Sequence, residues 1–221
     1  MTSKRLIALA LLGAAACLRS PATVPVEAGV TFATHPEDGG FVVDRLRGGE
    51  AGVLSPPGWL RTPNAPTFVL RSDDGDRAAL WLVGRSRVIV RGETSIRAPR
   101  TGEVISSWDD GAIRLALWSR DGSTLQTDTF RREGDGTAPP LLGRAAQSLD
   151  GTYRATVRDR EGAAVGWIQV RIEPDRPTSR AYDAVLPPGV EDGLAAAATV
   201  ALDGEIGWIE QHAVNGSGGA R

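Results

Sequence analysis

The sequence is poor in the residues that most often carry covalent or metal chemistry. Its 221 residues include one cysteine and two histidines. Because a disulfide needs two cysteines, none can form within the chain, and stability must come from a packed core. A body of about 200 residues is large enough to build such a core, as one domain or as two of roughly 100 residues each.

The two histidines are poorly positioned for catalysis. A Ser-His-acid site needs a histidine held by two hydrogen bonds in a preformed site. His35 lies at the edge of an N-terminal linker, and His212 lies just before a glycine-rich tail that contains Gly216-Ser217-Gly218. Two histidines without a thiol cluster are also too few ligands for a typical zinc site. The sequence therefore predicts no catalytic residue, no metal and no cofactor.

Charge of one sign does not dominate either. The chain has 25 basic and 27 acidic residues, and without Lys4 and Arg5 the basic residues number 23, which leaves a balance of −4. No basic patch is visible, so we expect no nucleic-acid partner. The acidic residues from Asp73 to Asp76 lack the spaced ligands of a calcium loop. Their position before and around Gly75 is typical of a turn.

The N-terminus carries an export signal. Lys4 and Arg5 precede an apolar stretch from Leu6 to Ala16, which ends in small residues. As a helix this stretch would rise about 16 Å, far short of the roughly 30 Å hydrocarbon core, so we expect it to be cleaved. Its last three alanines fit an ordinary signal peptidase, and they also fit a lipobox because Cys17 follows them.

These first 17 residues resemble those of bacterial lipoproteins, and the resemblance covers no more of the chain. It implies that Cys17 carries a diacylglycerol and that acyl chains, such as palmitate, hold the protein on a membrane. Leu18 and Arg19 follow, without the aspartate that retains some lipoproteins at the inner membrane. The resemblance therefore implies the cell envelope, and the outer membrane in preference to the inner one. Plain secretion is the alternative.

Composition divides the chain into five regions. The boundary between the two folded halves is expected in the segment 134–140, which is rich in glycine and proline. The predicted regions are a signal peptide (1–16), a lipidated cysteine and flexible linker (17–38), a first β-rich half (39–138), a second β-rich half (139–214) and a disordered tail (215–221).

Short segments rich in Val, Ile, Leu and Thr alternate with turn signals such as Asp121-Gly122, Glu161-Gly162 and Asp203-Gly204. This spacing predicts about twelve to fourteen strands, mostly antiparallel. The run from Leu194 to Leu202 is the only helix-like segment, and it fits a strand equally well. The predicted fold class is all-β, an antiparallel β-sandwich, either one large sandwich or two small Ig-like sandwiches in tandem.

The clearest hairpin is predicted over residues 152–173. Tyr153, Ala155 and Val157 alternate with polar residues in its first strand, and three apolar residues at 168, 170 and 172 alternate in the second. Near the end of the chain, residues 203–209 repeat the spacing of residues 161–168 with one residue fewer, which hints at a duplication.

Three tryptophans are predicted to share an exposed sheet face. Strand periodicity places Trp118, Trp167 and Trp208 on the polar side of their segments, and Arg171 shares that side with Trp167. Flat indoles beside arginine stack well on sugar rings or peptide side chains. The alternative, which we favour, is that this face packs against the rest of the protein or a partner, with arginines over the indoles.

The sequence supports three hypotheses about function. The first is a membrane-anchored, non-catalytic lipoprotein that acts as a scaffold, adaptor or accessory subunit of an envelope assembly, with an envelope protein as partner. The second is a glycan- or peptide-binding lipoprotein that uses the tryptophan face. The third and weakest is a carboxylate-based hydrolase, which needs two carboxyl groups about 5–10 Å apart in a cleft.

Overall fold

The structure is a computed structural model that describes residues 29–35, 39–45, 52–57, 64–72, 77–109, 112–133, 149–173 and 176–216. The predicted signal peptide, Cys17, the linker up to residue 28 and the boundary segment 134–140 lie outside the described residues. The acidic residues 73–76 also lie outside them. Of the predicted tail, residues 215 and 216 belong to the last helix, and residues 217–221 are outside the described part.

Thirteen strands and one helix make up the described part of the chain. They are β1 (Val30–His35), β2 (Gly40–Arg45), β3 (Gly52–Ser55), β4 (Phe68–Ser72), β5 (Arg77–Val83), β6 (Arg87–Arg91), β7 (Arg100–Asp109), β8 (Ala112–Ser119), β9 (Thr124–Thr127), β10 (Arg131–Arg132), β11 (Gly151–Arg158), β12 (Ala164–Glu173), β13 (Arg176–Val185) and α1 (Asp192–Gly216).

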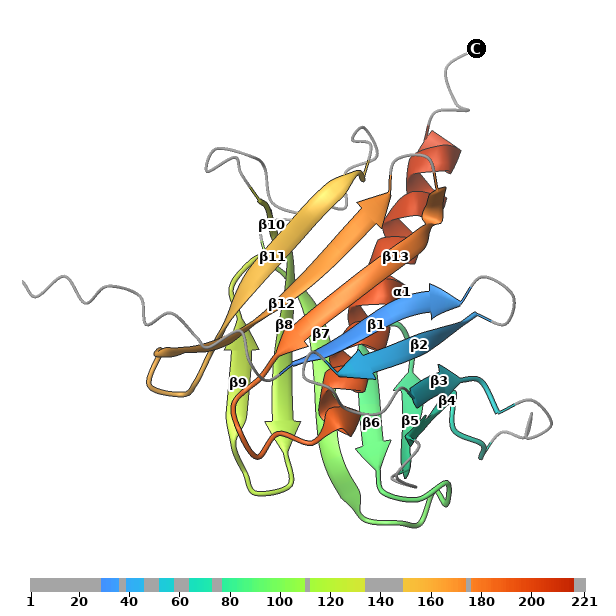
Figure 1. The fold of residues 1–221 in the computed structure, drawn as a ribbon, viewed down its shortest axis with the longest axis vertical. Helices are drawn as coiled ribbons and strands as arrows, with labels where there is room; N and C mark the ends of the chain where they lie inside the picture. Colours follow the sequence, from blue (N-terminus) through green and yellow to red (C-terminus); the bar gives the residue numbers. More distant parts are fainter. Residues whose placement is uncertain are drawn as a thin grey trace, which may run out of the picture.

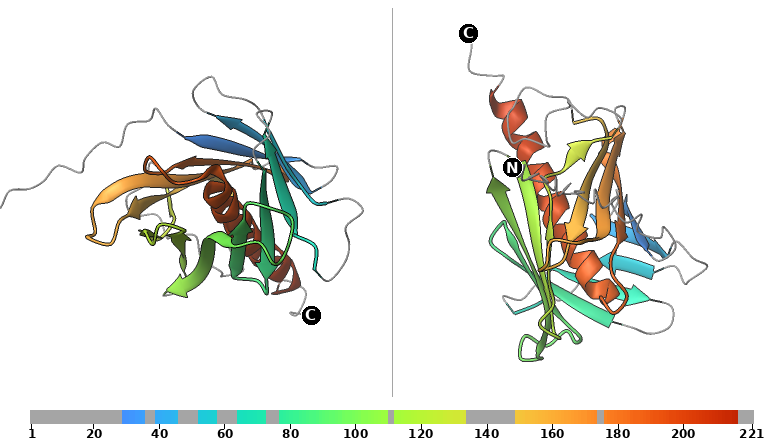
Figure 2. Two further views of the ribbon diagram at one scale, coloured as in Figure 1. Left: turned by 90° about the horizontal axis from the view of Figure 1, so that it is seen from below. Right: turned by 90° about the vertical axis from the view of Figure 1, so that its left-hand side faces the viewer.

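The strands form one antiparallel sheet that closes into a barrel (Figures 1 and 2). Strands β1 to β9 follow one another in chain order, and β11, β12 and β13 continue the sheet on the other side of β1. Phe32 of β1 therefore lies between Val43 of β2 and Tyr182 of β13. The ring closes where Thr127 of β9 pairs with Val157 of β11. The short β10 also pairs with β11 and stands outside the ring of twelve.

The predicted β-sandwich, single or double, is therefore wrong. The strands do alternate as a half-buried sheet requires: in β8, Ile113, Leu115 and Leu117 are buried, whereas Arg114 and Trp118 are exposed. Alternation tells which face of a strand is buried, but it does not tell which strands are neighbours. The pairing of β1 with β13 joins the two halves of the sheet, and the pairing of β9 with β11 closes it into one wall.

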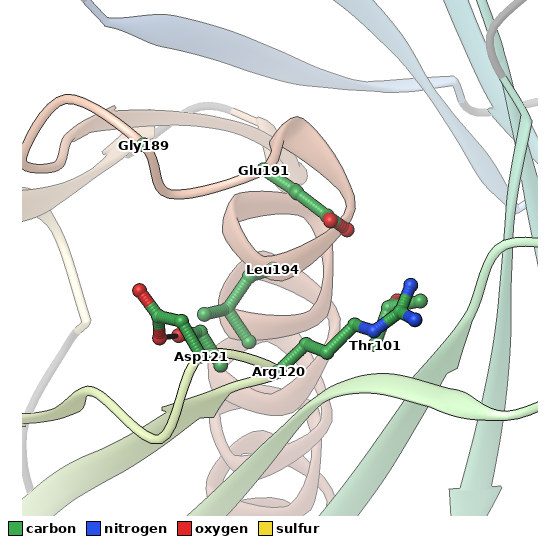
Figure 3. A pocket seen from close by; sticks show the side chains of 7 residues that line it. Thr101, Arg120, Asp121, Gly189, Glu191 and Leu194 are labelled. Carbon is green, nitrogen blue, oxygen red and sulfur yellow. Dashed lines mark hydrogen bonds between the residues drawn. The ribbon is translucent and has the colours of Figure 1, made fainter.

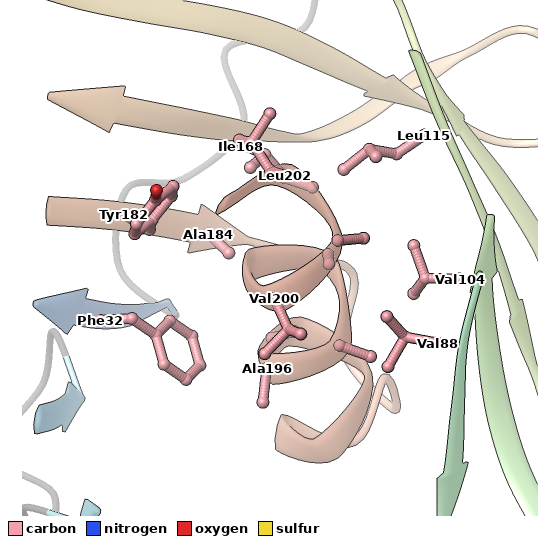
Figure 4. Packing of buried hydrophobic residues seen from close by; sticks show 14 of the residues in the cluster. Phe32, Val88, Val104, Leu115, Ile168, Tyr182, Ala184, Ala196, Val200 and Leu202 are labelled. Atoms are coloured by element: carbon pink, nitrogen blue, oxygen red, sulfur yellow. The ribbon is translucent and has the colours of Figure 1, made fainter. Parts of the chain in front are cut away.

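Helix α1 runs through the middle of the barrel, with strands on all sides of it (Figure 2). It packs against β5, β6, β7 and β8 on one wall and against β1 on another. Figure 4 shows Val200 of α1 between Phe32 on one wall and Val88 and Val104 on the other. Strand side chains fill a ring of about eight strands, but a ring of twelve leaves more space. The helix fills that space and completes the core.

The run from Leu194 to Leu202 is thus a helix and not a strand. Every residue from Gly193 to Leu202 is buried, so the helix has no polar face over these positions and no amphipathic period in its sequence. Asp203-Gly204, predicted as a turn, lies inside the same helix. The suggested duplication is wrong, because residues 203–209 are helical while residues 161–168 form a turn and a strand.

The hairpin predicted over residues 152–173 is confirmed. β11 and β12 pair antiparallel, with Tyr153 opposite Val170 and Ala155 opposite Ile168. All four of these side chains are buried. Gly162 in the connecting turn has φ 81°, a conformation that glycine adopts without strain. The acidic-glycine signal at residues 161 and 162 therefore marks a real turn.

Candidate functional site

The second half of α1 carries a buried carboxylate to the wall formed by β7. Glu205 is fully buried, and its carboxylate accepts hydrogen bonds from the Ser106 hydroxyl at 2.6 Å and from the Trp108 indole N–H at 2.9 Å. The Nε of Arg85, in the turn between β5 and β6, lies 3.4 Å from the same carboxylate. The Arg85 guanidinium also lies over Trp208 of α1, 4.3 Å from its ring centroid. Glu205 is therefore fully engaged in holding α1 to the barrel.

A second polar cluster joins α1 to β13. Arg180 is 8% exposed, and its guanidinium donates to the carboxylates of Asp203, at 2.6 Å, and Glu210. The Tyr182 hydroxyl, also from β13, donates to Asp203. The Arg180 backbone N–H donates to the hydroxyl of Thr34 on β1, at 2.8 Å. One arginine thus links two strands to two acidic residues on one face of the helix.

Burial shifts the titration of this second cluster. Burial opposes the charged form of Arg180, but the neighbouring Asp203, Tyr182 and Glu210 outweigh it and raise the pKa of the guanidinium. Burial raises the pKa of the Tyr182 hydroxyl, and the charge of Asp203 raises it further. Burial also raises the pKa of Glu210, which Arg180 offsets only in part. Both carboxylates contact the same guanidinium, which is the arrangement of a structural salt-bridge cluster. It does not present a free general acid and a free general base.

A pocket of about 370 Å³ lies at the other end of α1, where the helix begins (Figure 3). Residues from three segments line it: the start of β7, the end of β8 with the turn after it, and the loop into α1 with the first turn of that helix. The lining residues are Thr101, Ser119, Arg120, Asp121, Gly189, Glu191 and Leu194. The pocket therefore combines one guanidinium group, two carboxylates and two hydroxyls with one apolar side chain.

The turn after β8 holds the Asp121 side of this pocket in place. The Asp121 carboxylate accepts hydrogen bonds from the Ser119 hydroxyl and, at 2.8 Å, from the Ser123 backbone N–H. These bonds, with that from Ser119 contributing most, lower the pKa of Asp121 to about 2. Gly122, with φ 84°, completes the tight turn that the sequence predicts at Asp121-Gly122.

The three tryptophans predicted to share one sheet face do not all do so: Trp118 and Trp167 lie on the outer face of the sheet but on separated strands, and Trp208 is not on the sheet. Trp118 is exposed near the end of β8, and Trp167 is half-buried on β12 beneath the guanidinium of Arg154, 4.1 Å from the ring centroid. Strands β9 and β11 separate β8 from β12 in the ring. Trp208 is on α1 and not on a strand. Arg171 is exposed on β12 and lies 3.3 Å from Asp183.

Trp208 packs at the end of the barrel that is farther from the pocket. Its ring lies 5.8 Å from that of Trp108 and 4.1 Å from that of His212, measured between centroids. Its half-buried position and its contact with Arg85 match the packing alternative for this residue. His212 is exposed, and its Nδ1 lies 2.8 Å from the Trp208 carbonyl oxygen.

Within the described residues, no three His, Cys, Asp or Glu side chains gather closely enough to hold a metal ion. Among the same residues, no helix combines the length and the apolar character needed to cross a bilayer.

Sequence reasoning missed Glu205, Arg180 and the pocket. An acidic residue three positions after the apolar run 194–202 is the only signal for Glu205, and it carries meaning only once that run is known to be helical. Arg180 forms its hydrogen bonds with residues about 150 and about 20 positions away in the sequence. The pocket depends on the same long-range arrangement. The local sequence pattern predicts neither the contacts of Arg180 nor the pocket.

No protein-family model matches the chain, and no curated protein or solved structure is significantly similar to it.

Proposed function

We propose that the chain is a non-catalytic, lipid-anchored module that serves as a scaffold, adaptor or accessory subunit of a bacterial envelope assembly. The filled interior of the barrel carries this proposal. Barrels that bind small molecules in their interior keep a cavity there, whereas α1 occupies this interior and is buried from Gly193 to Leu202. A protein partner would then be recognised by the outer surface or by the two rims of the barrel.

The polar clusters inside the barrel support the same proposal. Glu205, Asp203 and Glu210 each bind to strand residues, so their carboxylates stabilise the attachment of α1. Catalytic carboxylates need free access to substrate and often an unusual pKa set for proton transfer. The Glu205 carboxylate is fully buried. The carboxylates of Asp203 and Glu210 are paired with the Arg180 guanidinium.

The first 17 residues support the membrane part of the proposal. The order of Lys4, Arg5, the apolar stretch and Cys17 is that of a lipoprotein signal. Acyl chains on Cys17 would keep the barrel at a membrane surface, and Leu18 and Arg19 favour the outer membrane.

Purification from native membranes after mild crosslinking tests the scaffold role. We expect an envelope protein to co-purify with the wild-type chain and to crosslink to it. A soluble monomer on size-exclusion chromatography, with no envelope protein attached under mild detergent, would contradict the proposal.

A Cys17→Ser variant tests the anchor separately. Metabolic labelling with a fatty acid should mark the wild-type chain and a Ser20→Ala control, and it should fail to mark Cys17→Ser. Labelling that persists in Cys17→Ser would show the lipoprotein part of the proposal to be wrong.

A further inference from the structure

The pocket where α1 begins has the size of a small-molecule site. Its volume of about 370 Å³ falls within the range of roughly 300–1,000 Å³ that ligand pockets occupy. It lies where α1 begins, and Leu194 is the residue of α1 that lines it (Figure 3).

The walls of this pocket are held before any ligand arrives. Leu194 forms its floor and is only 3% exposed. Gly102 of β7 lies against it: a Cβ there would be 3.0 Å from the Leu194 Cδ1, so a larger residue would require the leucine side chain to shift. The loop into α1 contains a turn in which the Val190 N–H donates a hydrogen bond to the Pro187 carbonyl, at 3.2 Å. A preformed site loses little entropy when it binds.

Two side chains of opposite charge enter the pocket without an ionic partner. Arg120 and Glu191 are both exposed, and neither forms an ion pair with another described residue. Figure 3 shows Arg120 reaching in from the turn after β8 and Glu191 from the position just before α1, with their charged ends directed to the same side and Leu194 on the other side. The carboxylate of Asp121, in contrast, is occupied by its own turn.

We propose that this pocket binds a small zwitterion, a molecule with an oxyanion and a primary ammonium group a few bonds apart. The Arg120 guanidinium binds the oxyanion, as a planar fork of donors suits carboxylate and phosphate. The Glu191 carboxylate binds the ammonium group, and the short chain between the two charges lies over Leu194. The Thr101 hydroxyl offers a further hydrogen bond beside Arg120.

A ligand with charge of a single sign fits less well. A simple anion would meet the negative charges of Glu191 and Asp121, and a simple cation would meet Arg120. Only a ligand with both charges compensates Arg120 and Glu191 together. Two biological sources share this chemistry: free amino acids or peptides, in which the oxyanion is a carboxylate, and the phosphoethanolamine headgroup of a lipid, in which it is a phosphate.

This inference goes beyond the proposed scaffold role and does not depend on it. The pocket can bind its ligand whether or not the barrel has a protein partner, so a failure of one proposal leaves the other to be judged by its own experiment.

Calorimetric titration of the purified full-length chain tests the pocket. The probes are glycylglycine and phosphoethanolamine, together with N-acetyl-glycylglycine, which lacks the ammonium group, and glycylglycinamide, which lacks the carboxylate. We expect at least one of the two zwitterions to bind. For a bound glycylglycine, each blocked analogue should bind at least about tenfold more weakly, because each loses a charge-assisted contact.

Three variants assign the contacts. Arg120→Gln and Glu191→Gln should each weaken zwitterion binding by about tenfold or more, while Arg131→Gln, at an exposed arginine on β10, should leave it unchanged. All three positions are exposed, so circular dichroism should report an unaltered fold. Binding of glycylglycine alone identifies the peptide source, and binding of phosphoethanolamine alone identifies the lipid source.

Three results would overturn the proposal: no binding of either zwitterion up to about 10 mM, equal binding of glycylglycine and its blocked analogues, or wild-type affinity in both pocket variants.

Discussion

At the scale of single residues, the buried carboxylate of Glu205 shows how one side chain fixes the helix inside the barrel. It is completely buried, yet the hydroxyl of Ser106 and the indole N–H of Trp108 satisfy it from the wall. A buried charge is costly unless hydrogen bonds compensate it. Both hydrogen-bond donors belong to one strand, and Arg85 adds an ion pair, so the compensation also sets the position of α1 along β7.

Replacing Glu205 with glutamine should destabilise the protein by about 2 kcal/mol. The amide keeps one acceptor oxygen, but its NH₂ group then faces a donor that the carboxylate had satisfied. Chemical denaturation monitored by circular dichroism measures the loss. Glu161→Gln, in the exposed turn between β11 and β12, serves as the control and should change stability by less than about 0.5 kcal/mol. An equal, small effect of both substitutions would contradict this role of Glu205.

Asp121 provides a prediction about pH. Its pKa is lowered to about 2 in the folded protein, chiefly by the Ser119 hydroxyl, from its ordinary value of 3.8. A carboxyl group with a depressed folded-state pKa stabilises the native state above its unfolded value, and this contribution is lost as the pH falls towards the folded value. We therefore expect the turn after β8 to weaken between pH 3.8 and about 2.

An NMR titration of the Asp121 carboxyl carbon should give a midpoint near 2 in the wild type. In Ser119→Ala the midpoint should move up towards 3.8, because the largest cause of the shift is removed. Ser107→Ala, at an exposed position on β7, should leave it unmoved. A midpoint that does not respond to Ser119→Ala would refute the assigned cause.

At the scale of elements, the glycines of α1 separate two roles within one helix. A Cβ at Gly193 would lie 2.8 Å from the Cβ of Ala78 and 3.1 Å from the Cγ1 of Val90. At Gly204 and Gly207 it would meet nothing within 4 Å. The first glycine allows the helix to approach the strands, whereas a side chain at either of the other two positions would meet no neighbouring atom.

Alanine substitutions should therefore have opposite effects along the helix. Gly204→Ala and Gly207→Ala should each stabilise the protein by roughly 0.5–1 kcal/mol, the amount by which alanine exceeds glycine in helix interiors. Gly193→Ala should destabilise it by about 1–3 kcal/mol, since the added methyl group overpacks the contact with β5 and β6. Thermal unfolding of the three variants checks the signs, and a shared sign would contradict the packing at Gly193.

Some elements could be predicted from the sequence, and others could not. The hairpin of β11 and β12 and the buried face of β8 could be predicted because Tyr153, Ala155 and Leu115 alternate with polar residues. Helix α1 could not, because it is buried on all sides from Gly193 to Leu202 and shows no polar stripe. A helix shows an amphipathic pattern only where one face meets water, and α1 has no such face over these residues.

At the scale of the whole molecule, α1 and the barrel depend on each other. The ring of twelve strands is too wide to be filled by its own side chains, and the apolar run of α1 has no other place to be buried. The core cluster accordingly includes residues of α1 together with residues from nearly every strand. Closure of the ring could not be predicted, because no local pattern in residues 30–35 indicates a partner in residues 176–185.

Removal of residues 192–221 should abolish the cooperative fold. Without α1, the inward side chains of the barrel, such as Phe32 and Val104, would line an empty apolar interior. We expect the truncated chain to bind a hydrophobic dye and to lose a sharp thermal transition. Removal of residues 217–221 alone, after the end of α1, is the control and should leave both properties unchanged. A truncated chain without α1 that still unfolds cooperatively would contradict the dependence.

The pairing of β1 with β13 also determines the order in which the chain can fold. Thr31 and Asp183, which are hydrogen-bonded at 2.8 Å, are 152 positions apart. When the chain leaves a ribosome or an export channel N-terminus first, β1 emerges long before β13. Until then one edge of β1 has no partner, and the interior has no helix. Contacts of such long range slow folding and expose apolar edges, so we expect the barrel to close only after nearly the whole chain has been released.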